Sequence, residues 1–464
     1  MKFNIRQIRI YKLFSILIFL VFICCIKDDS NNKILERHRS SLWINFFNKE
    51  LTGVIISDVF SPPQTSRIYA YSNIAAYEAM RVADDKFPSL LERLNGFDNI
   101  PNNEILIDPV IAGITAFNYV GKRLVYDSLP LFTAQNFFYD EIKSQRLSPS
   151  LLKFSKLFGD IVGEIIFKRS TKDGYLERTA NSGYLVEENN MEKWQPTPPA
   201  YIEAIEPHWN TLIPFTIDSA QQFKPKTHTP FSIIKNSKFH NQAIEVYEAV
   251  NNLDEEQRNI AMFWDCNPNQ SNNFGHLMFN SQQISPAGHW IHITCQVVDQ
   301  ENLSNLEASY ALAKVGITLA DSFIISWDEK YRSNLIRPET YINKYIDSEW
   351  KPILETPPFP EYTSAHSAAS KAASLVLADL FGDNFAYIDS TEIPFGMPTR
   401  KYKSFKQASD EAAISRLFGG IHYKPAVEAG KKQGEDLGNF IINKLDDGIN
   451  FKTLETNHLK DWQK

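Results

Sequence analysis

The sequence predicts an all-α protein made of helical bundles in two halves, joined by a long connection rich in proline and aromatic residues. Apolar residues recur at helical spacing in several long segments. No stretch alternates strand and helix patterns, and no internal repeat is evident. Hydrophobic residues form 43% of the 464-residue chain, which is enough to fill sizeable cores and argues against global disorder.

The N-terminal bundle is expected over residues 39–182. The spacing of apolar residues predicts helices at 66–85, 107–128 and 147–170. The sequence changes character at residues 183–237, where stretches such as QPTPPAYIEAIEPHWN combine proline with aromatic residues. This composition predicts a long ordered loop that connects the two halves.

The C-terminal part, residues 238–464, is expected to form the second helical domain. Gly382 suits the position just after a helix end, and Pro425 suits the start of a new helix. The predicted helices of this part cover 238–264, 303–332, 364–381, 410–423 and 426–445.

Residues 1–25 have the pattern of an export signal and are set apart from the fold. Four basic residues precede an apolar run at 13–26, which is too short for a comfortable membrane span. The run ends in Cys24-Cys25 and Ile-Lys-Asp-Asp follows, which resembles the signals of surface-exported Bacteroidetes lipoproteins.

We therefore expect an exported protein, held on a periplasmic or outer membrane surface by a lipid on Cys25 or Cys24. Residues 26–38 would be its tether. An ordinary secreted protein and an uncleaved anchor are the alternatives.

The net charge, the cysteines and the histidines narrow the kinds of molecule or ion that the protein is expected to bind. The net charge is −7 and no basic stripe stands out, so nucleic-acid binding has no support. After the signal, Cys266 and Cys295 are the remaining cysteines, and they could form a disulfide or stay free. Three nearby histidines, His276, His289 and His292, match no familiar zinc spacing and receive no role.

Three short motifs in the C-terminal half carry the chemistry. The first is Lys330 and Arg337-Pro338, whose spacing of nearly two helical turns would let both side chains point to one side. The second is Ser364-Ala365-His366 at a predicted helix start. The third is Ser415-Arg416 with His422 six residues after the arginine, across a Gly-Gly pair that suggests a break.

Together these motifs predict a site for an anion with several oxygens. Three cations gathered in a core repel one another unless such an anion balances them. Forked arginine donors, a lysine charge and the N–H groups of a helix start suit a tetrahedral oxyanion. Each motif alone is more often a solvated helix end or an ordinary cap, so only the three motifs together indicate an oxyanion site.

The combination resembles the signature of the phosphatidic acid phosphatase type 2/vanadium haloperoxidase superfamily, which reads Lys-x6-Arg-Pro, Pro-Ser-Gly-His and Ser-Arg-x5-His-x3-Asp. The stretch FPEYTSAH is also very similar to that of vanadium chloroperoxidases. The resemblance implies a chloroperoxidase-like helical fold and bound vanadate, a place that phosphate could also occupy. It implies that His422 ligates vanadium and that His366 is the acid–base group. The implied oxyanion-binding residues are Lys330, Arg337, Ser364, Ala365 and Arg416.

Trp327 and Phe359 stand where the chloroperoxidases have residues lining the halide side of the pocket, although both could be core aromatics. The implied reaction oxidises halide with hydrogen peroxide to hypohalous acid, which then meets an organic acceptor. Two alternatives stay open: an acid phosphatase that works through a phosphohistidine, and a non-catalytic lipoprotein that only binds an oxyanion. Neither the halide, the organic substrate nor the oligomeric state follows from the sequence.

Three positions depart from the family pattern. Thr363 replaces proline, and Ala365 replaces glycine but keeps its N–H group. Ala426 replaces the aspartate that would orient His422, so a backbone carbonyl or Glu428 is expected to take that role.

Overall fold

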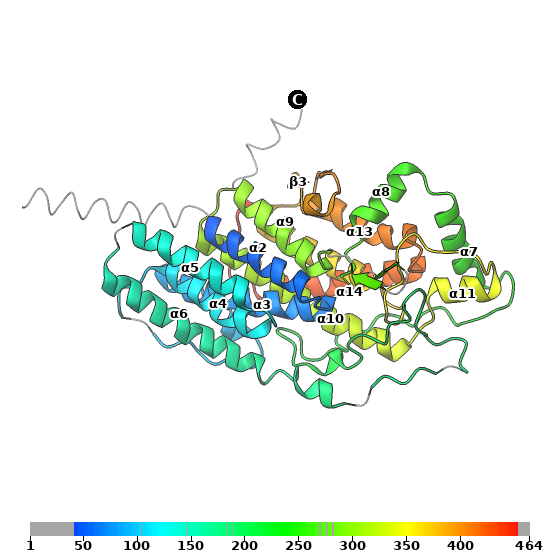
Figure 1. Ribbon diagram of the computed structural model, residues 1–464, viewed down its shortest axis with the longest axis horizontal. Helices are drawn as coiled ribbons and strands as arrows, with labels where there is room; N and C mark the ends of the chain where they lie inside the picture. Colours follow the sequence, from blue (N-terminus) through cyan, green and yellow to red (C-terminus); the bar gives the residue numbers. More distant parts are fainter. Residues whose placement is uncertain are drawn as a thin grey trace, which may run out of the picture.

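The computed structural model describes residues 41–452, apart from positions 103, 146, 182, 188, 269–270, 275–276 and 281–282. The export signal, the tether with Cys24 and Cys25, and His276 lie outside the described residues. The fold is all-α as predicted, and most of its helices run along the long axis of the molecule (Figure 1). The helices are α2 (Leu42–Ser57), α3 (Pro62–Met80), α4 (Pro109–Leu124), α5 (Leu129–Ser144), α6 (Pro149–Ser170), α7 (Lys238–Asn251), α8 (Glu255–Phe263), α9 (Pro286–Gln300), α10 (Asn305–Ser333), α11 (Pro338–Tyr345), α12 (Ala365–Phe381), α13 (Phe405–Phe418) and α14 (Lys424–Lys444).

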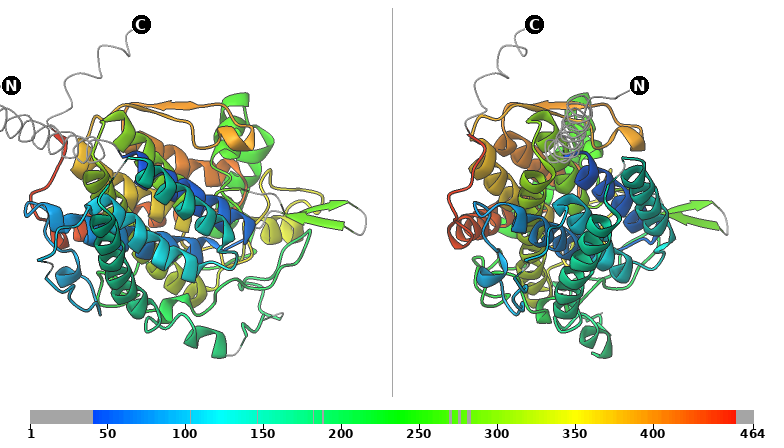
Figure 2. Two further views of the ribbon diagram at one scale, coloured as in Figure 1. Left: turned by 60° about the vertical axis from the view of Figure 1, so that its left-hand side comes forward. Right: turned by 90° about the vertical axis from the view of Figure 1, so that its left-hand side faces the viewer.

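Two short antiparallel hairpins interrupt the helical pattern and were not predicted. One pairs β1 (Ser271–Phe274) with β2 (Leu277–Asn280), and the other pairs β3 (Tyr387–Asp389) with β4 (Arg400–Tyr402). Figure 2 shows the first hairpin projecting from the helical body. Strands of three or four residues are too short to give a clear period-2 signal, which is why the sequence did not reveal them.

Helix α10 is the central element of the core. Its N-terminus is closed by a capping box between Ser304 and Glu307, and nearly all of its residues are buried. It packs against α3 from the N-terminal half and against α12 from the C-terminal half. Its length and composition would allow it to span a membrane, but its apolar stretch is wholly buried inside the protein.

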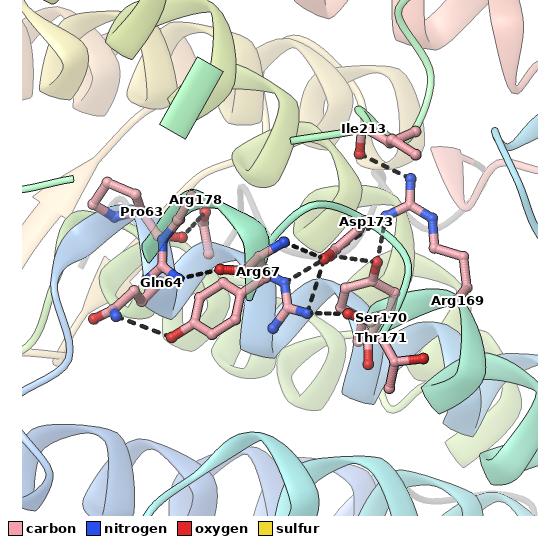
Figure 3. A network of polar contacts seen from close by, with 12 residues as sticks. Pro63, Gln64, Arg67, Arg169, Ser170, Thr171, Asp173, Arg178 and Ile213 are labelled. Atoms are coloured by element: carbon pink, nitrogen blue, oxygen red, sulfur yellow. Dashed lines mark hydrogen bonds and ion pairs between the residues drawn. The ribbon is translucent and has the colours of Figure 1, made fainter. Parts of the chain in front are cut away.

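The proline-rich connection is held by buried polar groups rather than by secondary structure (Figure 3). Asp173 accepts hydrogen bonds from Arg67 Nε of α3 at 2.7 Å and from the Tyr71 hydroxyl at 2.8 Å. Arg169 of α6 donates to the carbonyls of Ile213 and Pro214 at 2.9 and 2.8 Å. A long loop can be ordered in this way because buried carbonyls such as those of Ile213 and Pro214 find side-chain partners. The described residues of 183–237 contain no α-helix, as expected for a loop, and their role as a connection between two domains stays a prediction.

Helices α12 and α14 approach each other unusually closely at two glycines. A Cβ on Gly430 would lie 2.3 Å from the Ser364 carbonyl oxygen, and one on Gly434 would lie 2.2 Å from that of Ala368. Both obstacles are backbone atoms, so they cannot rotate away. This contact fixes the start of α12, where the second motif lies.

Gly430→Ala should therefore destabilise the protein by about 1–3 kcal/mol, the usual cost of overpacking, and should displace the start of α12. Gly53→Ala is the matched control, since no atom lies within 4 Å of the added Cβ. This control should be neutral or stabilising by up to about 1 kcal/mol. Denaturant unfolding of both variants measures the difference, and equal stabilities would contradict the close packing.

Candidate active site

Lys330 and Arg337 reach the same site, but not as two positions on one helix face. Helix α10 ends at Ser333, and Asn334 then turns the chain in the left-handed region, with φ of 51°. Arg337 is the N-cap residue of α11. The expectation that nearly two helical turns separate the residues was therefore wrong, because the chain turns sharply between them.

Lys330 holds the loop that leads into α12. Its Nζ atom donates to the carbonyls of Pro360, Glu361 and Thr363, at 3.0, 3.1 and 2.6 Å. All three ammonium donors are used in this way, so the structure shows Lys330 as a buried charge behind the loop. Its direct contact with an oxyanion stays a prediction.

Ser364 is the N-cap of α12, as the cap interpretation of the motif expected. Its Oγ accepts a hydrogen bond from the Ser367 N–H at 3.3 Å, and its own N–H donates to the Ala426 carbonyl at 3.1 Å. The first N–H groups of the helix, including that of Ala365, have no partner within the helix. The cap and the oxyanion interpretations therefore describe the same helix start.

The third motif is broken at the Gly-Gly pair, as predicted. Arg416 lies in the last turn of α13, Gly419 is the C-cap, and Gly420 has a φ of 81°. This turn brings His422 back towards the site. Arg416 donates to Ser415 Oγ at 2.9 Å and to the Trp264 carbonyl, and its charge lies near Asp265.

Glu361 orients His422 and was not found from the sequence. Its Oε1 accepts hydrogen bonds from His422 Nδ1 at 2.8 Å and from the Tyr423 N–H at 2.9 Å. With the proton on Nδ1, the lone pair of His422 Nε2 is an acceptor, and it takes a hydrogen bond from Arg337 Nη1 at 3.2 Å. The only signal in the sequence was an acidic residue inside FPEYTSAH, three residues before Ser364.

Because Glu361 takes this role, both expected substitutes for the missing aspartate, a backbone carbonyl and Glu428, are incorrect. Glu428 is exposed and lies 3.9 Å from Lys431 on the same helix. Ala426 is buried in a second, smaller core, where a carboxylate would be costly. The orienting carboxylate instead comes from the loop on the other side of the imidazole.

His366 lies beside Arg416 and faces the same pocket as His422. Its Nε2 atom is buried and has no hydrogen-bond partner. Burial lowers the pKa of His366 well below its usual value, and the charges of Arg416 and His289 add to this effect. His366 is therefore neutral at pH 7 and able to accept a proton.

Trp327 and Phe359 form an apolar wall of the pocket, as the resemblance implied. Their ring centroids lie 4.9 Å apart, and both residues line a small cavity of about 50 Å³. The connection fixes this wall, because the Ile205 carbonyl accepts from Trp327 Nε1 at 3.2 Å, while the Ile205 N–H donates to the Pro358 carbonyl at 3.1 Å.

The site has an excess of buried positive charge. Burial lowers the pKa of Lys330 well below its usual value, lowers that of Arg337 to about 10, and also lowers that of Arg416. Burial lowers the pKa of His422 as well, and nearby groups add to this effect: Arg337, Lys330, Arg416 and His366. The other four predicted cationic and imidazole groups therefore all act on His422. A bound oxyanion would oppose these shifts by favouring the charged forms.

The two cysteines are free thiols in separate places. Cys266 is buried and lines the pocket, whereas Cys295 is half-buried on α9. Of the histidines left without a role, His289 is fully buried beside Cys266, and His292 Nε2 lies 2.8 Å from the hydroxyl of Thr52.

The fold and the site together define a helical protein in which two imidazoles and buried cations gather at one cavity. Residues 310–450 match the model of the VCPO second helical-bundle domain. The structure is similar to that of the first bacterial vanadium-dependent iodoperoxidase, with 43% sequence identity, a TM-score of 0.83, and coverage of 88% of this chain and 97% of that one. The chain belongs to the vanadium-dependent haloperoxidase family.

More distant structures share the fold alone. The holo and apo forms of a bacterial vanadium-dependent chloroperoxidase are each 16% identical, with TM-scores of 0.59 and 0.60. They cover 83% and 82% of this chain, and 93% of their own chains in both cases. No curated protein sequence matches the chain.

Glu361→Gln should weaken oxyanion binding by about 10–100-fold, because removing the partner of a ligating histidine has effects of this size. Isothermal titration with orthovanadate measures the affinity, and Glu428→Gln, at the exposed glutamate, is the control.

The same titration should depend on pH. Burial raises the pKa of Glu361 to about 7, against the opposing charges of Arg337 and Lys330. As the pH falls through this value, the carboxylate becomes neutral and holds the Nδ1 proton of His422 less strongly. We therefore expect the affinity of the wild-type protein for orthovanadate to fall as the pH falls. A variant whose affinity and pH profile equal those of the wild type would contradict the assigned role of Glu361.

Proposed function

We propose that the protein is a vanadate-dependent haloperoxidase that oxidises iodide in preference to the smaller halides. The observation that carries the proposal is the pair of neutral imidazoles, His366 and His422, which face one small cavity backed by three buried cations. The iodoperoxidase of 43% identity supports the choice of halide.

The residues present fit vanadate. Arg337 Nη2 and His366 Nε2 are buried polar atoms without a partner, and the N–H groups at the start of α12 are further donors. His422 would ligate vanadium through Nε2, while Arg337, Ser364, Ala365 and Arg416 would hold the oxygens and Lys330 would supply charge. When bound, vanadate supplies a Lewis acid that polarises hydrogen peroxide. Phosphate has nearly the same shape and could occupy the same donors.

The chain's own residues would do three things in the reaction. Halide, hydrogen peroxide and one proton become hypohalous acid and water, and His366 is placed to move the proton. Glu361 keeps the Nδ1 proton on His422, which leaves Nε2 as the ligand. The rings of Trp327 and Phe359 exclude water from the halide, which favours iodide because iodide is the halide that loses its hydration most easily.

His422→Ala should abolish vanadate-dependent oxidation of iodide by hydrogen peroxide, because it removes the residue that would ligate vanadium. The measurement uses purified protein stripped of oxyanions, reloaded with orthovanadate, and assayed with iodide, bromide and chloride in parallel. Iodide should react fastest. Phosphoester hydrolysis without halide oxidation would instead favour the phosphatase alternative, and phosphate binding without turnover would favour the binding protein.

We further propose that residues 1–25 direct export and that Cys25 carries a lipid. This proposal rests on the sequence pattern alone. Expression in a bacterium fed a labelled fatty acid should label the wild type. Cys25→Ala should lose the label, whereas Cys295→Ala should keep it. Label retained in Cys25→Ala and lost in Cys24→Ala would move the modification to the neighbouring residue.

A further inference from the structure

A second cluster of ligand-type side chains lies beside the oxyanion site and has no part in the proposed reaction. His289 comes from the start of α9, Cys266 from the segment after α8, and Glu392 from the loop after β3. All three side chains are buried. The Trp264 ring stacks on His289, with centroids 4.4 Å apart, and meets the His366 ring edge-on at 6.0 Å. A tryptophan thus separates the cluster from the acid–base histidine.

The three side chains converge on one point. Cys266 Sγ lies 3.5 Å from His289 Nδ1, and Glu392 Oε1 lies 3.0 Å from the same nitrogen. One ligand atom from each residue lies within 4.8 Å of the other two. Bond lengths of 2.0–2.3 Å in a tetrahedral zinc site place neighbouring ligand atoms roughly 3.3–3.8 Å apart. The two separations from His289 Nδ1, 3.5 and 3.0 Å, are within a few tenths of an ångström of this range, and the sulfur and the carboxylate oxygen lie no more than 4.8 Å apart.

The other ring nitrogen of His289 has the partner that a metal-bound histidine requires. Its Nε2 atom lies 2.8 Å from Asp389 Oδ2, and the other oxygen of Asp389 accepts from the Thr391 N–H at 2.9 Å. Although burial opposes the charged form, Asp389 raises the pKa of His289 well above its usual value, so the metal-free ring is charged. A metal would replace the proton on Nδ1, while the carboxylate keeps the proton on Nε2. The carboxylate also holds the ring in position.

Hydrogen bonding alone leaves the cluster incomplete. Glu392 Oε1 is buried and makes no hydrogen bond, although it lies close to Nδ1. A proton on Nδ1 points in one direction and cannot serve both the sulfur and this oxygen. Burial raises the pKa of Cys266, so without a metal its thiol stays neutral. One divalent cation would satisfy all three atoms, because it draws on the thiolate, the imidazole and the carboxylate together.

We propose that Cys266, His289 and Glu392 bind a divalent metal of the zinc class, with Asp389 as the residue that positions His289. The mixed sulfur, nitrogen and oxygen set suits zinc better than calcium or magnesium, which prefer oxygen alone. Cys266 lines the oxyanion pocket, so water can reach a fourth position on the metal from that side. The site lies beside that of vanadate, and the charge of Arg416, which acts on Cys266, would favour its thiolate form.

The test measures metal binding directly, without enzyme activity. Purified protein, freed of vanadate because chelators remove it too, is titrated with zinc against a chromophoric chelator, and separately with cobalt. The expected result is one bound equivalent, with a thiolate-to-cobalt absorption band in the near ultraviolet. Cys266→Ser should lose the band and weaken zinc binding at least tenfold.

Two further variants make the result specific. Cys295→Ser is the matched control, since this thiol is on α9 outside the cluster, and it should leave the band and the affinity unchanged. Asp389→Asn should weaken zinc binding by about 10–100-fold while keeping the cobalt band. The proposal is overturned if the wild type binds no zinc in competition with the chelator. It is equally overturned if Cys266→Ser binds as tightly as wild type, because the metal would then lie elsewhere.

Discussion

The ammonium group of Lys330 and the carbonyls that surround it form the contact on which the rest of the site depends. One fully buried charge is satisfied by three backbone oxygens of the loop 360–363, and this fixes where α12 begins. The helix start then presents its N–H groups, and the same loop carries Glu361 against His422. A buried cation without such partners would be too costly to keep, so the loop and the lysine require each other.

Glu361 shows how one carboxylate serves two needs. It orients an imidazole by its hydrogen bond, and it supplies negative charge among Lys330 and Arg337, which oppose its tendency to become neutral. Its second oxygen is buried without a partner. The charge of the site is thus only partly balanced by the protein, which leaves room for an anion to complete it.

The sequence predicted the helical class, the helices that later became α3, α4, α6, α10 and α12, and the gathering of the three motifs. It did not predict α11 or the two hairpins as separate elements, because short elements take their stability from packing rather than from their own pattern. Helix α5, although 16 residues long, was also not predicted as a separate element. The reason given for pairing Lys330 with Arg337 was wrong, since a residue in the left-handed region, Asn334, cannot be recognised from spacing alone. The partner of His422 was missed for a similar reason: Glu361 is 61 residues away along the chain. The division into two domains stays a prediction.

The apolar wall of the pocket depends on the backbone carbonyl of Ile205. This residue belongs to the connection and to none of the three motifs, yet its backbone bonds both Trp327 and the turn beside Phe359. The apolar wall is thus supported by the connection as well as by Arg337, whose Nε donates to the Phe359 carbonyl at 2.9 Å. Variation in the connection can reshape the wall while the oxyanion donors stay constant. Halide preference in such a protein can therefore change through substitutions in the connection, which lies outside the three motifs.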